Sequence, residues 1–229
     1  MNRIKLELPE LNFAATEALN RLRINIRFVG VNTRRIMITS SQENEGKSTV
    51  SVNLWRMMAE AGFKTAFLDL DLRKSVIGSK YGITGEEQLF GIEHYLSGQC
   101  EIDQIICQTN IENGWMIPCT DTIENPSFLF EGERFTGLLD RLSQDFRYVI
   151  IDTPPLLAVA DGCQIASCCD ASILVVNRGV TSKKHVRQSI QQLNTVGCPI
   201  LGVVLNHAVS GGKHYYYSKK HHHSNNSNT

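Results

Sequence analysis

Five short apolar runs, separated by helix-length segments, constrain the fold of this chain more than any other feature. The runs are nearly continuous in hydrophobicity, and they cover residues 36–39, 66–70, 148–151, 172–176 and 200–205. Strands that are buried on both faces of a parallel sheet have this pattern. Segments of helical length lie between them, at residues 49–61, 131–144, 160–168 and 182–195. We therefore expect an α/β domain with a doubly wound, mostly parallel sheet.

The balance of charges argues against a global attraction to nucleic acid. The 229 residues include 23 Lys or Arg and 23 Asp or Glu, so we expect no nucleic-acid partner. No apolar run approaches the roughly 20 residues that a membrane-spanning helix needs. The seven cysteines lack Cys-x-x-Cys spacing, and no apolar segment of signal-peptide length follows Met1. These features predict a cytoplasmic protein with reduced thiols.

A small-residue turn ending in Gly-Lys-Ser joins the first apolar run to the helical segment that follows it. Its sequence is Ser41-Gln-Glu-Asn-Glu-Gly46-Lys47-Ser48-Thr49. In such a turn the backbone N–H groups and the helix N-terminus attract phosphate. The lysine reaches the β- and γ-phosphates, and the serine hydroxyl binds Mg²⁺. Ser41 stands where the general pattern has its first glycine, so an ordinary loop with an exposed lysine is the alternative interpretation.

Three aspartates follow two of the apolar runs. Asp152 ends one run and precedes Thr-Pro-Pro, while another run ends in Asp69-Leu-Asp71-Leu-Arg73. In phosphate-loop enzymes a strand-end aspartate holds Mg²⁺, and a turn-forming residue is the alternative for Asp152. Strand alternation directs Asp69 and Asp71 to one side, so we expect Mg²⁺ or Arg73 beside them. A carboxylate in this place can also accept the proton of an attacking hydroxyl.

The chain divides into three parts along its length. A helix is expected over residues 14–28, and the less clearly patterned region that follows the second run predicts a helix near 87–96 and a strand near 115–117. The last twenty residues are rich in Gly, Ser, Asn, His and Lys and almost free of aliphatic residues, which is typical of disorder. We expect an N-terminal helical segment suited to oligomerisation (1–30), one P-loop nucleotide-binding domain (31–209) and a disordered tail (210–229).

The ordered motifs resemble the cytoplasmic catalytic subunit of bacterial tyrosine kinases of the capsular and exopolysaccharide type. The resemblance extends over residues 14–217. The matching motifs are Gly46-Lys-Ser-Thr49, Asp69-x-Asp-x-Arg73, Asn125-Pro-Ser127, Asp152-Thr-Pro-Pro155 and Gly202-Val-x-Leu-Asn206. The resemblance implies a P-loop NTPase-like fold and a non-specific protein-tyrosine kinase that uses ATP and Mg²⁺. It also implies autophosphorylation and a role in regulating capsular or exopolysaccharide biosynthesis and export.

The resemblance also implies roles for individual residues. The catalytic residues would be Lys47, Asp69, Asp71 and Asp152, with Asp69 or Asp71 as the base. The nucleotide would be bound by Ser41, Asn44, Glu45, Gly46, Lys47, Ser48, Thr49, Arg73 and Asn206, with Asn206 facing the adenine. The metal ligands would be Ser48, Asp69 and Asp152. The autophosphorylated residues would be Tyr215, Tyr216 and Tyr217, for which an exposed sticky tail is the alternative.

Two segments depart from the family pattern. Glu43-Asn44 replaces the usual Pro-Gly of the phosphate loop, and asparagine tolerates a left-handed backbone better than most residues. The first-helix motif Glu-x-x-Arg-x-x-Arg, which docks one subunit on the next in a ring, is here Glu17-x-x-Asn20-x-x-Arg23. We expect a homo-oligomer, for which Asn20 weakens the ring. The resemblance also implies protein tyrosine substrates and a membrane-anchored activator whose cytoplasmic tail recruits the kinase to the inner face of the membrane.

Two other functions remain open at the level of sequence. Switch ATPases of the division-site and plasmid-partitioning type share this architecture, but they carry an extra lysine early in the phosphate loop, where this chain has Gln42. They also have no need of a tyrosine-rich tail. A non-catalytic nucleotide-binding regulator is the third possibility, because fold alone does not determine activity.

Overall fold

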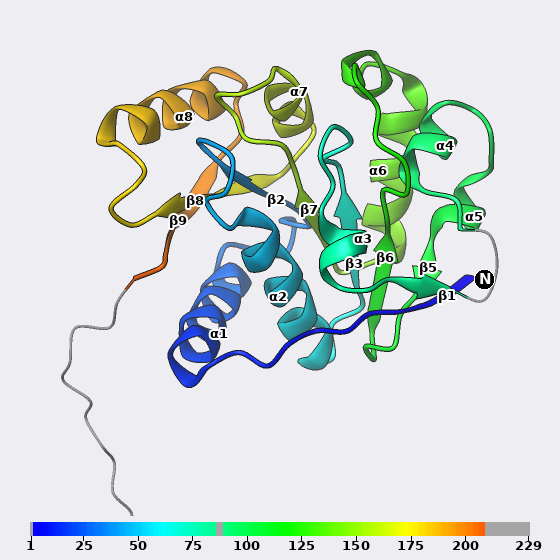
Figure 1. The fold of residues 1–229 in the computed structure, drawn as a ribbon, viewed down its shortest axis with the longest axis horizontal. Coiled ribbons are helices and arrows are strands. Elements are labelled where there is room, and N and C mark those ends of the chain that lie inside the picture. The colour runs from blue at the N-terminus through cyan, green and yellow to red at the C-terminus, as the bar shows by residue number, and fades with distance from the viewer. Residues whose placement is uncertain (1, 86–88, 209–229) are drawn as a thin grey trace, which may run out of the picture.

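The computed structural model describes residues 2–85 and 89–208, and these residues form one mixed sheet with helices on both faces (Figure 1). Within them the sheet has nine strands in the order β4-β1-β5-β6-β3-β7-β2-β8-β9. The elements in chain order are β1 (Asn2–Lys5), α1 (Phe13–Phe28), β2 (Arg35–Ser40), α2 (Lys47–Glu60), β3 (Thr65–Asp69), α3 (Ile77–Lys80), β4 (Thr84–Gly85), α4 (Ile92–Leu96), α5 (Ile102–Ile105), β5 (Cys107–Gln108), β6 (Gly114–Ile117), the 3₁₀ helix η1 (Ser127–Phe130), α6 (Glu133–Asp145), β7 (Tyr148–Asp152), α7 (Asp161–Ser167), β8 (Ala171–Asn177), α8 (Lys183–Thr195) and β9 (Ile200–Asn206).

The six neighbouring strands from β6 to β9 run parallel to one another. Strand β2 lies near the middle of this block, where Met37 is level with Ile151 of β7 and Ser172 of β8. Strands β2, β3, β7 and β8 are buried along almost their whole length, which explains why their sequences do not alternate. The expected doubly wound α/β fold is confirmed.

Separate apolar cores join the helices to the two faces of the sheet. Helices α1 and α2 pack on the face that carries Ile36, Ile38 and Phe67. Helices α4 to α8 pack on the opposite face, which carries Met37 and Leu68. Successive residues of one strand therefore contribute to different cores, as the two-residue period of a strand requires.

Helix α2 is anchored deeply in the first of these cores. Trp55 is fully buried and meets the ring of Phe67 edge-on, with 6.0 Å between the ring centroids. Its indole N–H donates to the carbonyl of Thr65 at 3.2 Å, so the polar end of the ring is also satisfied. This anchoring matters for function because the first residue of α2 is Lys47.

Some elements differ from the expectation. The run at 200–205 was expected to be buried on both faces, but β9 is the last strand of the sheet, and Val203 and Leu205 are 50% and 52% exposed. The helix expected near 87–96 forms only over Ile92–Leu96, after Gly91, and part of the expected range lies outside the described residues. The first thirty residues contain β1 in addition to the expected helix, and β1 pairs with β5. The strand expected near 115–117 is confirmed as β6.

The described residues contain no helix that is both long and apolar enough to cross a membrane. All seven cysteines carry free thiols, and four of them are buried. The tail expected over 210–229, including its tyrosines, lies outside the described residues.

Candidate active site

The sheet topology brings the phosphate loop and the strand-end aspartates to one edge. Strands β2, β7 and β3 are adjacent and parallel, so their carboxyl ends lie together. Asp152 is level with Ile38 of β2 and with Asp69 of β3. Ligands of open α/β sheets bind beyond the carboxyl ends of the strands, and the loop that follows β2 at Ser40 closes over this edge.

The backbone of the phosphate loop turns through two left-handed residues. Asn44 has φ 62° and Gly46 has φ 88°, so the asparagine adopts the conformation that we expected of it. Gly46 caps the N-terminus of α2, and a Cβ at this position would lie 2.0 Å from Asn206 Nδ2. Glycine is thus required at position 46 for both its backbone angle and its close packing.

Three predicted nucleotide-binding residues brace the loop instead of lining the cavity. The buried carboxylate of Glu45 accepts hydrogen bonds from the amides of Ser41 and Gln42, at 2.8 and 3.2 Å, and from the hydroxyl of Thr181. The Ser41 hydroxyl is paired with that of Ser189 at 2.9 Å. Asn206 donates from Nδ2 to the carbonyl of Glu45 at 3.0 Å. These contacts hold the loop in a shape that leaves its remaining N–H groups available for an anion.

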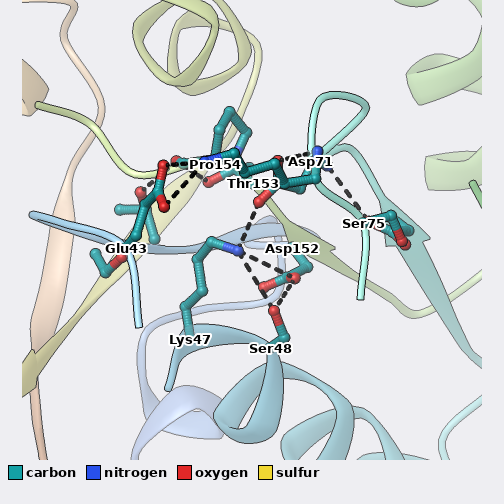
Figure 2. Close-up of polar contacts among 12 residues, drawn as sticks. Glu43, Lys47, Ser48, Asp71, Ser75, Asp152, Thr153 and Pro154 are labelled. Carbon is teal, nitrogen blue, oxygen red and sulfur yellow. Dashed lines mark hydrogen bonds and ion pairs between the residues drawn. The ribbon is translucent and has the colours of Figure 1, made fainter. Parts of the chain in front are cut away.

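Lys47 lies among carboxylates at the base of the site, as Figure 2 shows. Its Nζ is 2.8 Å from Asp71 Oδ2 and 3.8 Å from Asp152 Oδ2. Ser48 donates to Asp152 Oδ2 at 2.7 Å, and Ser51, one helical turn further on, donates to Oδ1 at 3.0 Å. Burial lowers the pKa of Lys47, but the charges of Asp152 and Asp71 outweigh burial and raise it overall, so this lysine is fully cationic.

Two buried carboxylates lie close together at the base of the site, and a bound cation would stabilise their charged forms. Asp69 and Asp152 are 0% and 1% exposed and lie level on adjacent strands. Burial raises the pKa of Asp152 against the opposing effect of Lys47. Burial and the charge of Asp152 also raise the pKa of Asp69 to about 8, although the Ser75 hydroxyl donates to Asp69 at 2.5 Å. With the Ser48 hydroxyl these groups form an all-oxygen donor set, which fits a hard divalent cation such as Mg²⁺.

The raised pKa of Asp69 predicts a pH-dependent effect of the Asp69→Asn substitution on stability. Between about pH 4 and pH 8 the folded protein keeps a proton that the unfolded chain releases, so stability falls as the pH rises through this window. The Asp69→Asn variant has no carboxyl group at this position, so its stability does not fall in this way as the pH rises. In EDTA we expect its melting temperature to match that of the wild type near pH 4 and to exceed it by several degrees at pH 9.

Thermal unfolding followed by circular dichroism at the two pH values measures this difference. Asp140→Asn is the matched control, because the side chain of Asp140 is 68% exposed. A gain in melting temperature for Asp69→Asn that is equal at pH 4 and pH 9 would contradict the proposed titration.

We expected Mg²⁺ or Arg73 close to Asp69 and Asp71; Arg73 is near enough to interact with the charge of Asp71, but its ion pair is with another carboxylate. Lys47, and not Arg73, is the cation in contact with Asp71. The guanidinium of Arg73 pairs with the buried carboxylate of Asp161 at 2.7 Å, and it also donates to the carbonyl of Glu124 and to Ser127. Arg73 thereby ties the segment after β3 to the Asn-Pro-Ser segment and to α7.

Asp161 and Ser51 are residues of the site that sequence reasoning missed. Asp161 is 1% exposed and also accepts from Ser127 at 2.5 Å. Asp161 was not predicted because it is 88 residues from Arg73 in sequence and no local pattern indicates the contact. Ser51 could have been predicted, because a residue three positions after Ser48 lies on the same face of the helix.

A cavity of about 570 Å³ opens above this cluster. Its walls include Asn44, Gly46, Lys47, Ser48, Thr49, Asp71 and Arg73 from the predicted set, together with Glu43, Lys74, Val76, Lys80, Pro154, Pro155, Ala158, Val159 and His207. Asp69 and Asp152 lie beneath it. The volume is within the usual range for small-molecule sites.

Glu43 is paired with Lys74 Nζ at 2.9 Å, so its charge near the phosphate loop is balanced.

Comparison with known proteins identifies the family. A family model described as an AAA domain matches residues 33–198. The tyrosine-protein kinase CpsD of Streptococcus agalactiae is 37% identical over 83% of this chain and 82% of that protein. The solved kinase domain of the Escherichia coli tyrosine kinase ETK superposes with a TM-score of 0.80 at 29% identity, over 88% of this chain and 79% of that one. The septum site-determining protein MinD of Pyrococcus horikoshii superposes with a TM-score of 0.63 at 21% identity, over 76% of this chain and 70% of that one.

These comparisons decide between the kinase and the switch ATPase. The likeness to MinD is too remote in sequence to show more than a shared fold, whereas the tyrosine kinases match at higher identity over most of the chain. The P-loop NTPase-like fold is confirmed, and the AAA-domain match together with the kinase relatives implies the use of ATP. The chain belongs to the bacterial tyrosine-protein kinase family.

Proposed function

We propose that this protein transfers the γ-phosphoryl group of ATP to tyrosine hydroxyls within the cavity above Lys47. The observation that carries the proposal is the contact of Lys47 with Asp71 and Asp152 beneath a loop shaped for phosphate. Phosphoryl transfer needs little covalent chemistry from the protein, because positioning and charge neutralisation supply most of the catalysis. A partly buried lysine beside carboxylates and a helix N-terminus provides both.

Different residues at the base of the cavity would bind the phosphates and Mg²⁺. The loop amides and Lys47 would hold the phosphates, with Lys47 exchanging its contact with Asp71 for the phosphate oxygens. Ser48, Asp69 and Asp152 would hold Mg²⁺, since Ser48 is hydrogen-bonded to Asp152 and Asp69 is level with Asp152 on the adjacent strand. Mg²⁺ bound there would neutralise charge on the phosphate oxygens. Asn44, Gly46 and Thr49 line the cavity and would contact the nucleotide, while Ser41, Glu45 and Asn206 would act by shaping the loop.

Asp71 is better placed than Asp69 to act as the base. Asp71 is 6% exposed and lines the cavity, whereas Asp69 is fully buried beneath it. In the transfer step the tyrosine oxygen forms a bond to the γ-phosphorus, and the bond from that phosphorus to the bridging oxygen of ADP breaks. Asp71 takes the hydroxyl proton. The apolar wall that includes Val76, Pro155 and Val159 suits the tyrosine ring.

The tyrosines at 215–217 are the proposed acceptors of the chain's own phosphoryl groups. Three tyrosines in an otherwise polar segment that is almost free of aliphatic residues are unsuited to a core, which supports a substrate role. We expect the variant in which Tyr215, Tyr216 and Tyr217 are all replaced by phenylalanine to lose most ATP-dependent phosphotyrosine, because phenylalanine lacks the attacking oxygen. Anti-phosphotyrosine immunoblotting after incubation with ATP and Mg²⁺ measures this loss.

The matched control for the tail variant replaces three tyrosines elsewhere in the chain. Tyr81, Tyr95 and Tyr148 are 1%, 8% and 2% exposed and occupy core positions, so tyrosine-to-phenylalanine changes there should leave labelling largely intact. The tail variant should keep nucleotide affinity within about twofold of the wild type, because Tyr215, Tyr216 and Tyr217 are not among the residues proposed to bind the nucleotide. Unchanged labelling of the tail variant would remove 215–217 as acceptors.

The proposed setting of this reaction involves other proteins. A membrane-anchored activator would bind the kinase through the activator's cytoplasmic tail, recruit the kinase to the inner face of the membrane and connect it with capsular or exopolysaccharide production.

Self-association is supported by α1, where Phe13 and Phe28 are 80% and 82% exposed. Exposed apolar residues of this size favour an interface, and Asn20 on the same helix bears on whether that assembly closes into a ring.

A further inference from the structure

The four lysine and arginine side chains that line the cavity differ in how their charges are balanced. Three of them are paired with carboxylates: Lys47 with Asp71, Arg73 with Asp161, and Lys74 with Glu43. Lys80 lines the same cavity, and among the described residues it forms no ion pair. Sequence reasoning did not single out Lys80, because nothing in its local pattern marks it.

Lys80 nevertheless has a defined position. It is the last residue of α3, and its Nζ donates to the hydroxyl of Thr49 at 2.5 Å. The same ammonium lies over the ring of Tyr81, 5.4 Å from the ring centroid, which restricts the lysine further. Tyr81 is 1% exposed and therefore fixed. A lysine from α3 is thus held against the first turn of α2.

The electrostatic surroundings of Lys80 are those of a cation that lacks an anion. Burial lowers the pKa of Lys80, Asp152 opposes this effect, and the neighbouring charge of Lys47 lowers it further. Two ammonium groups near one helix N-terminus are unfavourable together unless a negative group lies between or beside them. A nucleotide phosphate in the cavity would meet that requirement.

We propose that Lys80 binds the α-phosphate of the nucleotide, as a second phosphate-binding lysine of this site. The inference rests on the proposed ATP site at the 41–49 loop. In such loops the lysine reaches the β- and γ-phosphates, and the backbone N–H groups cradle the α- and β-phosphates. Thr49 lies two residues beyond Lys47, at the inner end of that cradle. The Nζ held on its hydroxyl would therefore reach the α-phosphate.

The test compares nucleotide affinity of Lys80→Ala with that of Lys74→Ala. Each variant removes one lysine from the lining of the same cavity, but Lys74 is already paired with Glu43. Titration with a fluorescent ribose-labelled ADP, with Mg²⁺ present, should give a Kd about tenfold higher for Lys80→Ala and a clearly smaller increase, about threefold or less, for Lys74→Ala, whose only charge effect is to leave the half-exposed Glu43 unpaired. A non-hydrolysable ATP analogue should lose affinity for Lys80→Ala by the same factor as ADP, because both carry an α-phosphate.

The possible outcomes separate this inference from the function on which it rests. Failure of the wild type to bind either nucleotide would overturn the ATP site itself. Normal wild-type binding with an unchanged Kd for Lys80→Ala, or with equal losses for both lysine variants, would overturn the role of Lys80 alone. A loss confined to the ATP analogue would place Lys80 at the γ-phosphate and contradict the assignment. The melting temperature without nucleotide should be the same for Lys80→Ala and the wild type, and a large decrease would indicate a structural role instead.

Discussion

Lys47→Met is expected to lower ATP-dependent tyrosine phosphorylation at least about 100-fold. Methionine has a similar length but no charge, so it fills the space beside Asp71 and Asp152 without neutralising phosphate oxygens. The loss should appear in the rate of phosphotyrosine formation at saturating ATP, measured by quantitative immunoblotting or by incorporation of labelled phosphate.

The fold of this variant must be checked separately, because Lys47 also neutralises buried carboxylates. Far-UV circular dichroism should be unchanged, although the melting temperature is expected to fall. Lys184→Met on the exposed surface of α8 is the matched control and should keep the wild-type rate. A folded Lys47→Met protein with more than about one tenth of the wild-type rate would show that the cavity described here is not the site of transfer.

Asp71→Asn is expected to reduce the rate of tyrosine phosphorylation about 100-fold or more while leaving ADP affinity unchanged or tighter. The amide cannot accept the hydroxyl proton, which removes general-base catalysis. It also releases Lys47 from its 2.8 Å contact, and the free lysine can then bind phosphate more readily. Single-turnover phosphorylation and ADP titration on the same preparation separate the two effects.

Asp103→Asn is the matched control, since the side chain of Asp103 is 79% exposed and lies outside the cavity lining. A weaker ADP affinity for Asp71→Asn would assign Asp71 to metal or nucleotide binding in place of proton transfer. A rate within about tenfold of the wild type would leave Asp69 as the remaining candidate for the base.

Sequence was sufficient for the parts of this protein that repeat a simple physical pattern. Strands buried on both faces produce continuous apolar runs, so the strands around Met37 and Ile150 were correctly predicted. Parallel strands place their carboxyl ends at one edge, and this is why Asp69, Asp152 and the phosphate loop were expected together. The left-handed backbone of Asn44 followed from the properties of asparagine.

The remaining features depend on contacts between residues far apart in sequence. The partner of Arg73 is Asp161, 88 residues away, and no local pattern could have indicated it. The edge exposure of β9 depends on its place in the sheet order and not on its own composition. Short strands such as β1 and β5 have too few residues to show a period, and each forms because a neighbouring strand is available to pair with it.

The bracing of the phosphate loop illustrates the same limit within the site. Ser41, Glu45 and Asn206 were predicted to touch the nucleotide because they occupy motif positions. In the structure, a buried glutamate and a distant asparagine hold the loop backbone instead. Motif position identified residues that matter for the loop but did not distinguish those that line the cavity from those that support it.

The account is tested most directly by measuring phosphotyrosine and released inorganic phosphate in one reaction. The purified chain is incubated with ATP, Mg²⁺ and a candidate activator tail, and modified residues are mapped by mass spectrometry alongside Lys47→Met. We predict phosphotyrosine at 215–217 in the wild type and none in the variant. Release of inorganic phosphate without any phosphotyrosine, under every activating condition, would contradict the kinase and favour a switch ATPase.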